Sequence, residues 1–198
     1  MSTAYIVDDD AAIRDALLWL FKSRAVPARA WPSAEEFLKH YNDDMTGCLL
    51  LDIRMEGMTG LELFEQLQAC HCRLPIIFLT GHGDVAMAVA SVKRGAHDFI
   101  EKPFNDNDLV DRVVAALAHD AHQRSERASL ESVEAKLQQL TEREQEVMQR
   151  ILAGKLNKVI ADELGIAVRT VEVHRSRLFE KMGVRSAVEL SQLLARRH

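Results

Sequence analysis

Carboxylates and one lysine follow short apolar runs at separate places in the chain, and these residue types suit phosphoryl transfer. Asp8 and Asp9 come directly after one run, and Asp52 comes directly after another. Lys102 lies further along and is followed at once by Pro103. A carboxylate can accept a phosphoryl group, and a lysine can neutralise charge on its oxygens. This combination predicts a phospho-accepting aspartate site.

The apolar runs are expected to bring these side chains together. Both runs have the pattern of buried strands, Tyr5–Val7 in one case and Cys48–Leu51 in the other. In an open parallel sheet, ligands gather beyond the carboxyl ends of the strands, so residues at those ends meet in one crevice. Crowded carboxylates would repel one another, and a hard divalent cation relieves that repulsion. Mg²⁺ is the usual choice beside phosphate.

The first 118 residues alternate strand and helix patterns. This alternation predicts a doubly wound α/β domain with a five-stranded parallel sheet and right-handed crossovers. Ser33 and Glu36 have the spacing of a helix-capping box, and Gly95 is placed to end the fourth helix. Asp10 precedes a helical pattern, so we interpret it as a helix cap rather than a ligand. The predicted strands are Ala4–Val7, Val26–Trp31, Cys48–Leu51, Pro75–Leu79 and His97–Ile100.

Charge is unevenly distributed along the 198 residues, whose net charge is −5. Residues 1–118 hold 11 Lys/Arg and 18 Asp/Glu, residues 119–140 hold 3 and 4, and residues 141–198 hold 11 and 8. An acidic first part and a mildly basic tail suggest that any nucleic-acid contact belongs to the tail. We expect a domain at 1–118, a helical linker at 119–136 and a small all-α domain at 137–198.

Neither a targeting segment nor a membrane span is expected. The N-terminus lacks a basic segment followed by an apolar core, and no apolar run approaches the roughly 20 residues that span a bilayer. These patterns predict a cytoplasmic protein with no membrane partner. The three cysteines lack a Cys-x-x-Cys pair, which argues against a disulfide framework or zinc site. Cys70-His71-Cys72 could bind metal, but a polar helix end with reduced thiols is the favoured interpretation.

The linker region is predicted to form one long helix. From Asp106 to Leu140 no proline or glycine interrupts, and good helix formers dominate. His119 and His122 lie three residues apart, and we interpret them as part of a solvated helix face. An apolar stripe in the linker could pack on a partner helix or on the second domain. Its members are Leu130, Val133, Leu137 and Leu140.

The tail has the spacing of a helix-turn-helix. Thr141 and Glu144 predict a capping box for a helix that reaches Ala153, and a short helix Asn157–Leu164 is followed by a third at Val168–Met182. The inward face of the first of these helices is predicted to be Val147, Met148, Ile151 and Leu152. At about 100° per residue, one face of the third helix is apolar and the opposite face is polar.

The polar face of the third tail helix is predicted to read the DNA major groove. Glu172 can accept from cytosine N4, Val173 can touch a thymine methyl group, and Ser176 can bond a base or a phosphate. The predicted buried face is Val171, His174, Leu178 and Met182. The other predicted DNA contacts are Arg169 on the reading face and the phosphate-binding residues Lys158, Thr170, Arg175 and Arg177.

Four motifs over residues 3–118 resemble the receiver domain of two-component response regulators. They are Ile6-Val7-Asp8-Asp9-Asp10, Leu51-Asp52-Ile53-Arg54-Met55, Leu79-Thr80-Gly81-His82-Gly83-Asp84 and Asp98-Phe99-Ile100-Glu101-Lys102-Pro103-Phe104. The resemblance implies that Asp52 is the phosphoacceptor and that Lys102 pairs with the phosphoryl group. It further implies a Mg²⁺ site formed by Asp8, Asp9, Asp52 and the Arg54 carbonyl, and a switch formed by Thr80 and Phe99.

Three motifs over residues 136–198 resemble the LuxR-type DNA-binding domain. They are Leu140-Thr141-Glu142-Arg143-Glu144, Asn157-Lys158-Val159-Ile160-Ala161 and Arg169-Thr170-Val171-Glu172-Val173-His174-Arg175-Ser176-Arg177. Together with the receiver, these motifs make the chain similar to NarL/FixJ-type response regulators, in the FixJ-like branch by its turn from Thr80 to Asp84. Two residues depart from the family pattern: Glu56 stands where proline is usual, and Ala167 where a capping serine is frequent.

The resemblance implies a transcription regulator rather than an enzyme. Its partners would be a sensor histidine kinase, double-stranded promoter DNA, RNA polymerase and, when phosphorylated, a second copy of the chain. Phosphatases that form an aspartyl intermediate are an alternative, but they need a second carboxylate two residues after the nucleophile, where Arg54 stands. A flavin-binding domain is another alternative, but the chain lacks the hydroxyl-rich phosphate loop that this cofactor needs.

Overall fold

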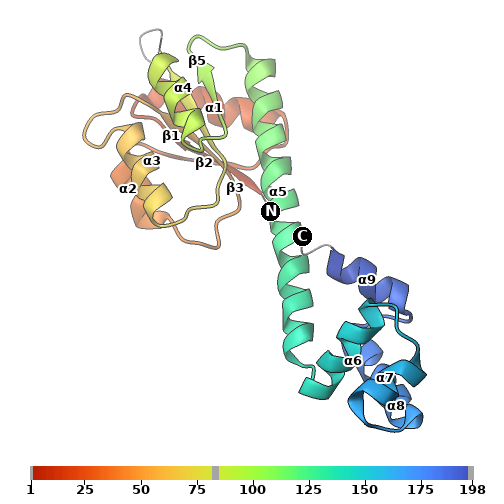
Figure 1. The fold of residues 1–198 in the computed structure, drawn as a ribbon. Coiled ribbons are helices and arrows are strands. Elements are labelled where there is room, and N and C mark those ends of the chain that lie inside the picture. The colour runs from red at the N-terminus through yellow and green to blue at the C-terminus, as the bar shows by residue number, and fades with distance from the viewer. Residues whose placement is uncertain (1, 82–84, 196–198) are drawn as a thin grey trace. The chain divides into compact units, whose positions relative to one another are not determined.

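The computed structural model describes residues 2–81 and 85–195. The chain divides into two compact units, Met1–Arg124 and Ser125–His198. Figure 1 labels the helices and strands in chain order. None of the helices within the described ranges combines the length and apolar character needed to cross a membrane.

A five-stranded parallel sheet forms the centre of the N-terminal unit, as predicted. The strand order is β2-β1-β3-β4-β5, with crossovers between neighbours that are distant in sequence. Each strand begins and ends within one residue of its predicted bounds, except that β2 begins two residues later than predicted. The strands are β1 (Thr3–Val7), β2 (Ala28–Trp31), β3 (Gly47–Asp52), β4 (Ile76–Thr80) and β5 (Asp98–Glu101).

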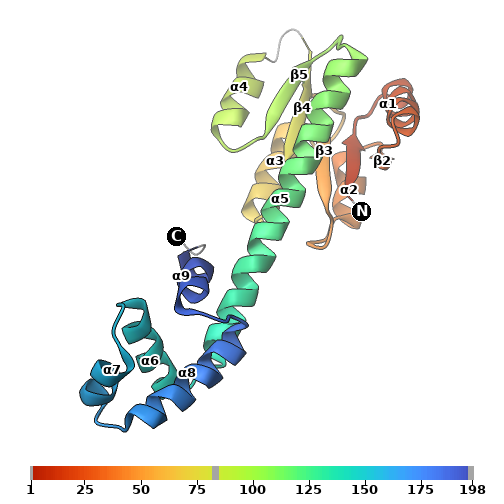
Figure 2. The same cartoon turned by 90° about the vertical axis from the view of Figure 1, so that its right-hand side faces the viewer.

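Helices cover both faces of this sheet, which gives a three-layer α/β unit (Figure 2). On one face, strand residues such as Ile6 and Leu50 pack with α1 (Ala11–Ser23) and the first part of α5 (Asp106–Gln138). On the other face, alternate strand residues such as Leu51 and Phe78 pack with the remaining helices. This alternation follows from the two-residue period of a strand. The remaining helices are α2 (Ala34–His40), α3 (Gly60–Ala69) and α4 (Val85–Lys93).

Local capping agrees with the sequence patterns. The Asp10 carboxylate accepts a hydrogen bond from the amide of Ala12 at 2.8 Å, which confirms it as the cap of α1. Ser33 accepts from the amide of Glu36 and caps α2. The fourth helix ends at Lys93, and Gly95 follows with a φ of +107°. Few other residues adopt that backbone conformation, so glycine is well placed after this helix.

One tie between α5 and the start of β3 was not predicted. Asp120 on α5 is 4% exposed and accepts hydrogen bonds from the amide of Gly47 at 3.0 Å and from Arg124 Nε at 2.9 Å. Gly47 has a φ of +135°, and a Cβ at this position would lie 1.9 Å from the carbonyl oxygen of Thr3. Residue 47 therefore has no room for a side chain. The glycine backbone fits at this position, and its amide reaches Asp120.

Four further helices form the C-terminal unit around one apolar core. They are α6 (Glu142–Leu152), α7 (Asn157–Leu164), α8 (Val168–Met182) and α9 (Ala187–Ala195). The capping box of Thr141 and Glu144 is present, with both of its hydrogen bonds. Helix α9 was not predicted, although its Leu190 is fully buried in the core. The prediction that Leu152 faces inward was wrong: it is 41% exposed, because the helix ends there and its last residue lies beyond the buried stripe.

Helix α5 is continuous from Asp106 to Gln138, which confirms the prediction of one long helix. Leu137 near the end of α5 and Leu140 just after the helix belong to the core of the C-terminal unit. Leu130, by contrast, is 40% exposed. Two lysines tie the ends of α5 and α8 together. Lys136 Nζ donates to the carbonyl of Met182 at 3.2 Å, and Lys181 Nζ donates to the carbonyl of Gln139 at 3.0 Å.

Candidate functional site

The strand register places two of the predicted aspartates side by side. Val7 on β1 pairs with Leu51 on β3, so the residues that follow them, Asp8 and Asp52, lie at the same level of the sheet's carboxyl edge. Both carboxylates are buried: Asp8 is fully buried and Asp52 is 8% exposed. Thr80 ends β4, the strand beside β3, and is also fully buried. The carboxyl edge of the sheet therefore gathers the polar residues that the sequence analysis selected.

Lys102 connects these carboxylates. Its Nζ lies 2.8 Å from Asp8 Oδ2 and 2.9 Å from Asp52 Oδ1, and its side chain is 22% exposed. The backbone amide of Lys102 donates to the carbonyl of Thr80 at 2.7 Å, which holds the residue just beyond the end of β5. The predicted meeting of Asp8, Asp52 and Lys102 is thus present in the structure.

Burial and charge shift the pKa values in this site. Burial raises the pKa of Asp52, and the neighbouring charges of Asp8 and Asp9 raise it further, although Lys102 opposes the shift. Burial alone would lower the pKa of Lys102, but its hydrogen bonds to Asp8 and Asp52 outweigh burial and raise it. The lysine therefore stays charged at neutral pH. Ionisation of the Asp52 carboxyl group, by contrast, is made less favourable by burial and by the neighbouring negative groups.

Asp9 completes a cluster that could hold a cation. One carboxylate oxygen from each of Asp8, Asp9 and Asp52 can be chosen so that all three lie within 4.8 Å of one another. No other group of three or more His, Cys, Asp or Glu side chains within residues 2–81 and 85–195 meets this condition. The oxygen-only donor set suits a hard divalent cation such as Mg²⁺.

The loop after Asp52 contributes a contact that the sequence analysis missed. The backbone amide of Glu56 donates a hydrogen bond to Asp9 Oδ2 at 2.9 Å. Two residues later, the amide of Met58 donates to Glu35 Oε1 at 2.9 Å, and the amide of Gly60 donates to the carbonyl of Ile53 at 3.0 Å. The loop is thus tied at three points. Only the unusual residue at position 56 hinted at this arrangement.

Thr80 and Phe99 lie on neighbouring strands and on the same face of the sheet. Phe99 pairs with Phe78, and Thr80 lies two residues beyond Phe78 on β4. Side chains two residues apart share a face, so Thr80 and Phe99 are neighbours across the β4–β5 pair. The Thr80 hydroxyl donates to the carbonyl of Gly81 at 2.9 Å. The rest of the predicted turn, His82 to Asp84, lies outside the described residues.

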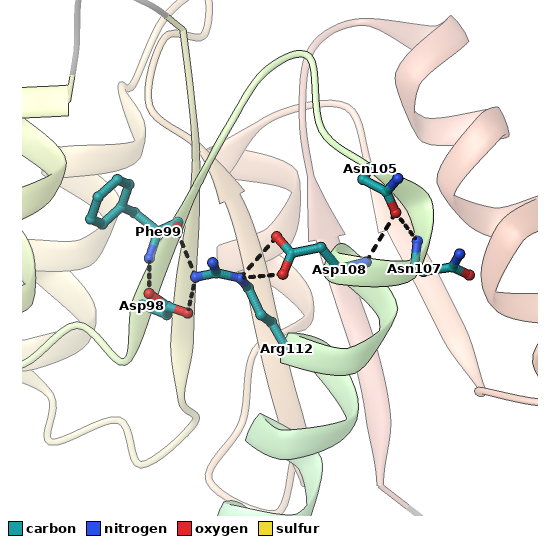
Figure 3. A network of polar contacts seen from close by, with 6 residues as sticks. All are labelled: Asp98, Phe99, Asn105, Asn107, Asp108 and Arg112. Carbon is teal, nitrogen blue, oxygen red and sulfur yellow. Dashed lines mark hydrogen bonds and ion pairs between the residues drawn. The ribbon is translucent and has the colours of Figure 1, made fainter.

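A polar network fixes the backbone of β5 around Phe99 (Figure 3). Arg112 on α5 reaches Asp98 Oδ2 at 2.7 Å and Asp108 Oδ2 at 3.1 Å. Asp98 Oδ1 accepts from the amide of Phe99 at 2.8 Å, while the Phe99 ring points away from the arginine (Figure 3). Because Asn105 accepts from the amide of Asp108 at 3.3 Å, the network also includes the start of α5.

Helix α8 exposes the residues that were predicted to meet DNA. Its buried face contains Val171, Leu178 and Met182, all at 0% exposure. The fourth predicted member, His174, is only half-buried, and its Nδ1 is buried without a hydrogen-bond partner. Of the predicted DNA contacts, those exposed on α8 are Arg169, Thr170, Glu172, Val173, Ser176 and Arg177, and Lys158 on α7 is exposed as well. Arg175 is half-buried, with its guanidinium 5.2 Å from the centre of the Phe179 ring.

The N-termini of α7 and α8 lack side-chain caps. Leu156 precedes α7 and Ala167 precedes α8, and neither makes a capping hydrogen bond through its side chain. The first amides of a helix point outward and carry partial positive charge, which favours anions such as phosphate. The absence of a capping residue at these two ends is therefore compatible with a nucleic-acid interface in the C-terminal unit.

Two family models match the chain, in the order that the fold suggests. Residues 4–114 match the response regulator receiver domain, and residues 138–194 match the bacterial regulatory proteins of the luxR family. The first match covers the α/β unit and its aspartate cluster. The second covers α6 to α9 and includes the exposed face of α8. The predicted receiver and LuxR-type domains are thereby confirmed.

Several known proteins are similar over nearly the whole chain. The C4-dicarboxylate transport transcriptional regulatory protein DctR of Rhodobacter capsulatus is 48% identical over 193 residues, which cover 96% of this chain and 98% of that protein. The transcriptional regulatory protein FixJ of Bradyrhizobium diazoefficiens is 38% identical, with 97% and 94% covered. Among solved structures, the response regulator StyR is 41% identical and has a TM-score of 0.91, with 98% of each chain covered.

Proposed function

The chain belongs to the NarL/FixJ-type response regulators, and on that basis we propose that a phosphoryl group on Asp52, received from a sensor histidine kinase, controls its binding to promoter DNA. A receiver and a LuxR-type DNA-binding domain in one chain indicate phosphorylation-dependent regulation of transcription. One observation carries the choice of Asp52: Lys102 Nζ bridges the buried carboxylates of Asp8 and Asp52 at 2.8 and 2.9 Å.

Mg²⁺ is the proposed cofactor of this site. Three carboxylates share it with one ammonium group, so negative charge is in excess even with Lys102 in place. We assign Asp8, Asp9 and Asp52 as ligands, together with the backbone carbonyl of Arg54. When bound, Mg²⁺ neutralises negative charge on the phosphoryl oxygens during transfer.

Asp52 is the proposed nucleophile of the transfer. One of its carboxylate oxygens forms a bond to phosphorus while the bond from phosphorus to the imidazole nitrogen of the kinase breaks, and the leaving imidazole stays with the kinase. Lys102 pairs with an oxygen of the arriving phosphoryl group and neutralises part of its charge. The reaction relies on position and charge rather than on a dedicated acid or base, so the chain needs no further enzyme activity of its own.

Thr80 and Phe99 are the proposed switch. A phosphoryl oxygen on Asp52 offers the Thr80 hydroxyl a stronger acceptor than the Gly81 carbonyl that it now uses. Movement of Thr80 leaves space on the same face of the sheet, into which the ring of Phe99 can turn. The surface formed by α4, β5 and α5 changes as a result, and we propose that two phosphorylated copies associate through it.

The exposed face of α8 is the proposed reader of DNA. Glu172 and Val173 reach base edges in the major groove, and Ser176 bonds a base or a phosphate. Phosphates are bound by Lys158, Thr170, Arg175 and Arg177, which fixes the position of the helix without reading sequence. A dimer would place two such helices on two half-sites. We further propose that the protein acts in the cytoplasm and that RNA polymerase is its partner at the promoter.

The decisive experiment follows the phosphoryl group. With Mg²⁺ and a phosphorylated histidine kinase or a small acyl phosphate donor, the wild-type chain should acquire an acid-stable mass increase and a phosphoryl label, whereas Asp52→Asn should show only background. Circular dichroism of the variant should match the wild type. Label on Asp52→Asn at the wild-type level would contradict the assignment of the phosphoacceptor.

The same two proteins test the coupling to DNA. Sedimentation should show a larger dimer fraction for the phosphorylated wild type than for Asp52→Asn under identical conditions. Because a dimer gains effective concentration on paired half-sites, phosphorylation should tighten binding to a full operator far more than to a single half-site. Equal dimer fractions with and without phosphorylation would rule out dimerisation as the cause of tighter binding.

The DNA-reading face is tested by comparing two kinds of variant on operators selected from random DNA. Glu172→Ala or Val173→Ala should relax preference at one position of each half-site, at a cost of about 1–3 kcal/mol on the preferred sequence. Arg177→Ala should instead weaken binding to all sequences alike and reduce the salt dependence. Unchanged base preference in the first two variants would mean that another surface reads the DNA.

A further inference from the structure

The backbone amide of Glu56 holds Asp9, and this contact distinguishes the chain from one with proline at the same place. The amide donates to Asp9 Oδ2 at 2.9 Å. A proline has no amide hydrogen, so it could not make this bond whatever its conformation. The carboxylate of Glu56, on an exposed residue, is a separate feature whose charge acts through solvent. Position 56 therefore offers two contributions that substitutions can separate.

The carboxylate of Asp9 depends on a hydrogen bond for its position more than the carboxylates of Asp8 and Asp52 do. Asp8 is fully buried and Asp52 is 8% exposed, and Lys102 bridges them both. Asp9 is exposed, so packing does not hold its carboxylate beside the other two. An amide bond to a carboxylate is a charge-assisted hydrogen bond, which restricts the carboxylate in direction as well as position. Within the described residues, the hydrogen bond from the Glu56 amide is the contact that orients the Asp9 carboxylate.

This hydrogen bond is compatible with cation binding. A carboxylate offers about four lone-pair positions on its two oxygens, and the amide occupies one of them. One carboxylate oxygen from each of Asp8, Asp9 and Asp52 lies within 4.8 Å of the other two in the same structure in which the Glu56 bond is formed. The assembled cluster and the bond therefore coexist.

The loop presents the amide of residue 56 from fixed ends. Met58 is tied through its amide to Glu35, and Gly60 is tied through its amide to Ile53. None of these contacts uses the amide or the side chain of residue 56. Loss of the amide hydrogen at position 56 is therefore expected to remove the bond to Asp9 without releasing the loop.

We propose that the Glu56 amide is a positioning group for Asp9 that raises the affinity of the acidic cluster for Mg²⁺. The inference rests on the magnesium site of the proposed function. Hydrogen bonds that orient a metal ligand from outside the coordination shell typically contribute roughly 10- to 100-fold to metal affinity. We therefore expect Mg²⁺ affinity to fall about tenfold when the amide hydrogen is removed. The side-chain charge of Glu56 contributes much less, because its residue is exposed.

The test is a calorimetric titration of the unphosphorylated full-length protein with MgCl₂. Glu56→Gln keeps the amide and removes the charge, whereas Glu56→Pro removes both. We expect Glu56→Gln to bind Mg²⁺ within about twofold of the wild type, and Glu56→Pro to bind about tenfold more weakly than Glu56→Gln. Asp9→Asn serves as the reference for loss of the ligand itself. Equal affinity of the proline and glutamine variants would overturn the inference.

A measurement on the wild type avoids any doubt about folding of the proline variant. In ¹⁵N-labelled protein, the Glu56 amide should stay protected from hydrogen exchange after Mg²⁺ saturation, since the bond is expected to persist in the loaded site. Loss of that protection on adding Mg²⁺ would mean that the bond competes with the cation, which also overturns the inference. If the wild type shows no Mg²⁺ binding at all, the magnesium site of the proposed function fails with it.

Discussion

Two contacts between a lysine and a buried carboxylate, one in each unit of the chain, differ in how completely the charge is balanced. In the N-terminal unit, Lys102 meets Asp8 and Asp52, and a third carboxylate lies beside them. In the C-terminal unit, Lys181 pairs with a single described carboxylate, that of Glu144, at 2.7 Å. Glu144 also accepts from the backbone amide of Thr141 at 2.9 Å. One site has excess negative charge, and the other is complete.

The pKa directions express this difference. Burial, assisted by neighbouring aspartates, raises the pKa of Asp52. Burial also acts to raise the pKa of Glu144, but hydrogen bonds from Lys181 and Thr141 outweigh it and lower the pKa. A carboxylate with all its partners stabilises the fold, whereas a carboxylate short of positive charge can bind a cation and a phosphoryl group. A lysine–carboxylate contact thus has its charge balanced in one unit and an excess of negative charge in the other.

Removal of Lys102 should have the largest effect on stability. Lys102→Ala would leave the buried carboxylates without their cation, and we expect a loss of about 3 kcal/mol in the free energy of unfolding without Mg²⁺. Added Mg²⁺ should restore much of that loss, because it supplies positive charge to the same cluster. Both tryptophans, Trp19 and Trp31, lie in the N-terminal unit, so tryptophan fluorescence during urea unfolding measures this unit.

Lys181→Ala is the matched control for this comparison. It removes the lysine from a complete pair, and Mg²⁺ should restore none of the resulting loss, which far-UV circular dichroism would report. Equal Mg²⁺ responses of the two lysine variants would show that the clusters do not differ in their need for a cation.

Substitution of Glu144 should have a smaller, pH-dependent effect. Glu144→Gln is expected to cost about 1.5 kcal/mol at pH 7, since it removes the ionic part of the contact with Lys181. The pKa of Glu144 is lowered by folding from its usual 4.5. Its stabilising contribution is therefore present above pH 4.5 and is lost as the pH falls through the lower folded value. Urea unfolding followed by circular dichroism at several pH values should show the variant and wild type converging in acid.

Asp52→Asn should have the smallest effect and the opposite sign. Folding raises the pKa of Asp52 above 3.8, so the folded protein binds this proton more readily than the unfolded chain. Without Mg²⁺, the variant should be more stable than the wild type at pH 7 by about 1 kcal/mol. The difference should shrink as the pH falls through the raised value. Tryptophan fluorescence measures it, and a less stable variant at pH 7 would contradict the charge imbalance described here.

The sequence was sufficient to predict the buried site, because strand patterns determine it. Apolar runs placed Asp8, Asp52 and Thr80 at strand ends, and parallel strands bring their carboxyl ends together. The bond from the Glu56 amide could not be predicted, since it depends on the path of a loop rather than on a periodic pattern. The tie from Asp120 to Gly47 was missed for the same reason, because it joins residues 73 positions apart.

The C-terminal unit was predictable in its helices but less so in its contacts. Capping residues and glycines predicted the bounds of α6, α7 and α8 closely, and Gly165 and Gly183 end the last two in left-handed backbone conformations. Helix α9 was not predicted, although its Leu190 is fully buried in the core of this unit. Which exposed residues of α8 contact DNA depends on the bound DNA as well as on the fold. These contacts are therefore a proposal.

The two lysines that tie α5 to α8 bear on where an independently folding fragment can begin. Lys136 on α5 donates to the last carbonyl of α8, and Lys181 on α8 donates to the carbonyl just after α5. Each lysine thus satisfies the open end of the other's helix, where cations are favoured. A fragment starting at residue 137 would contain every proposed DNA contact yet lose half of this reciprocal pair. The last turn of α5 consequently belongs, in terms of cooperative folding, with α8.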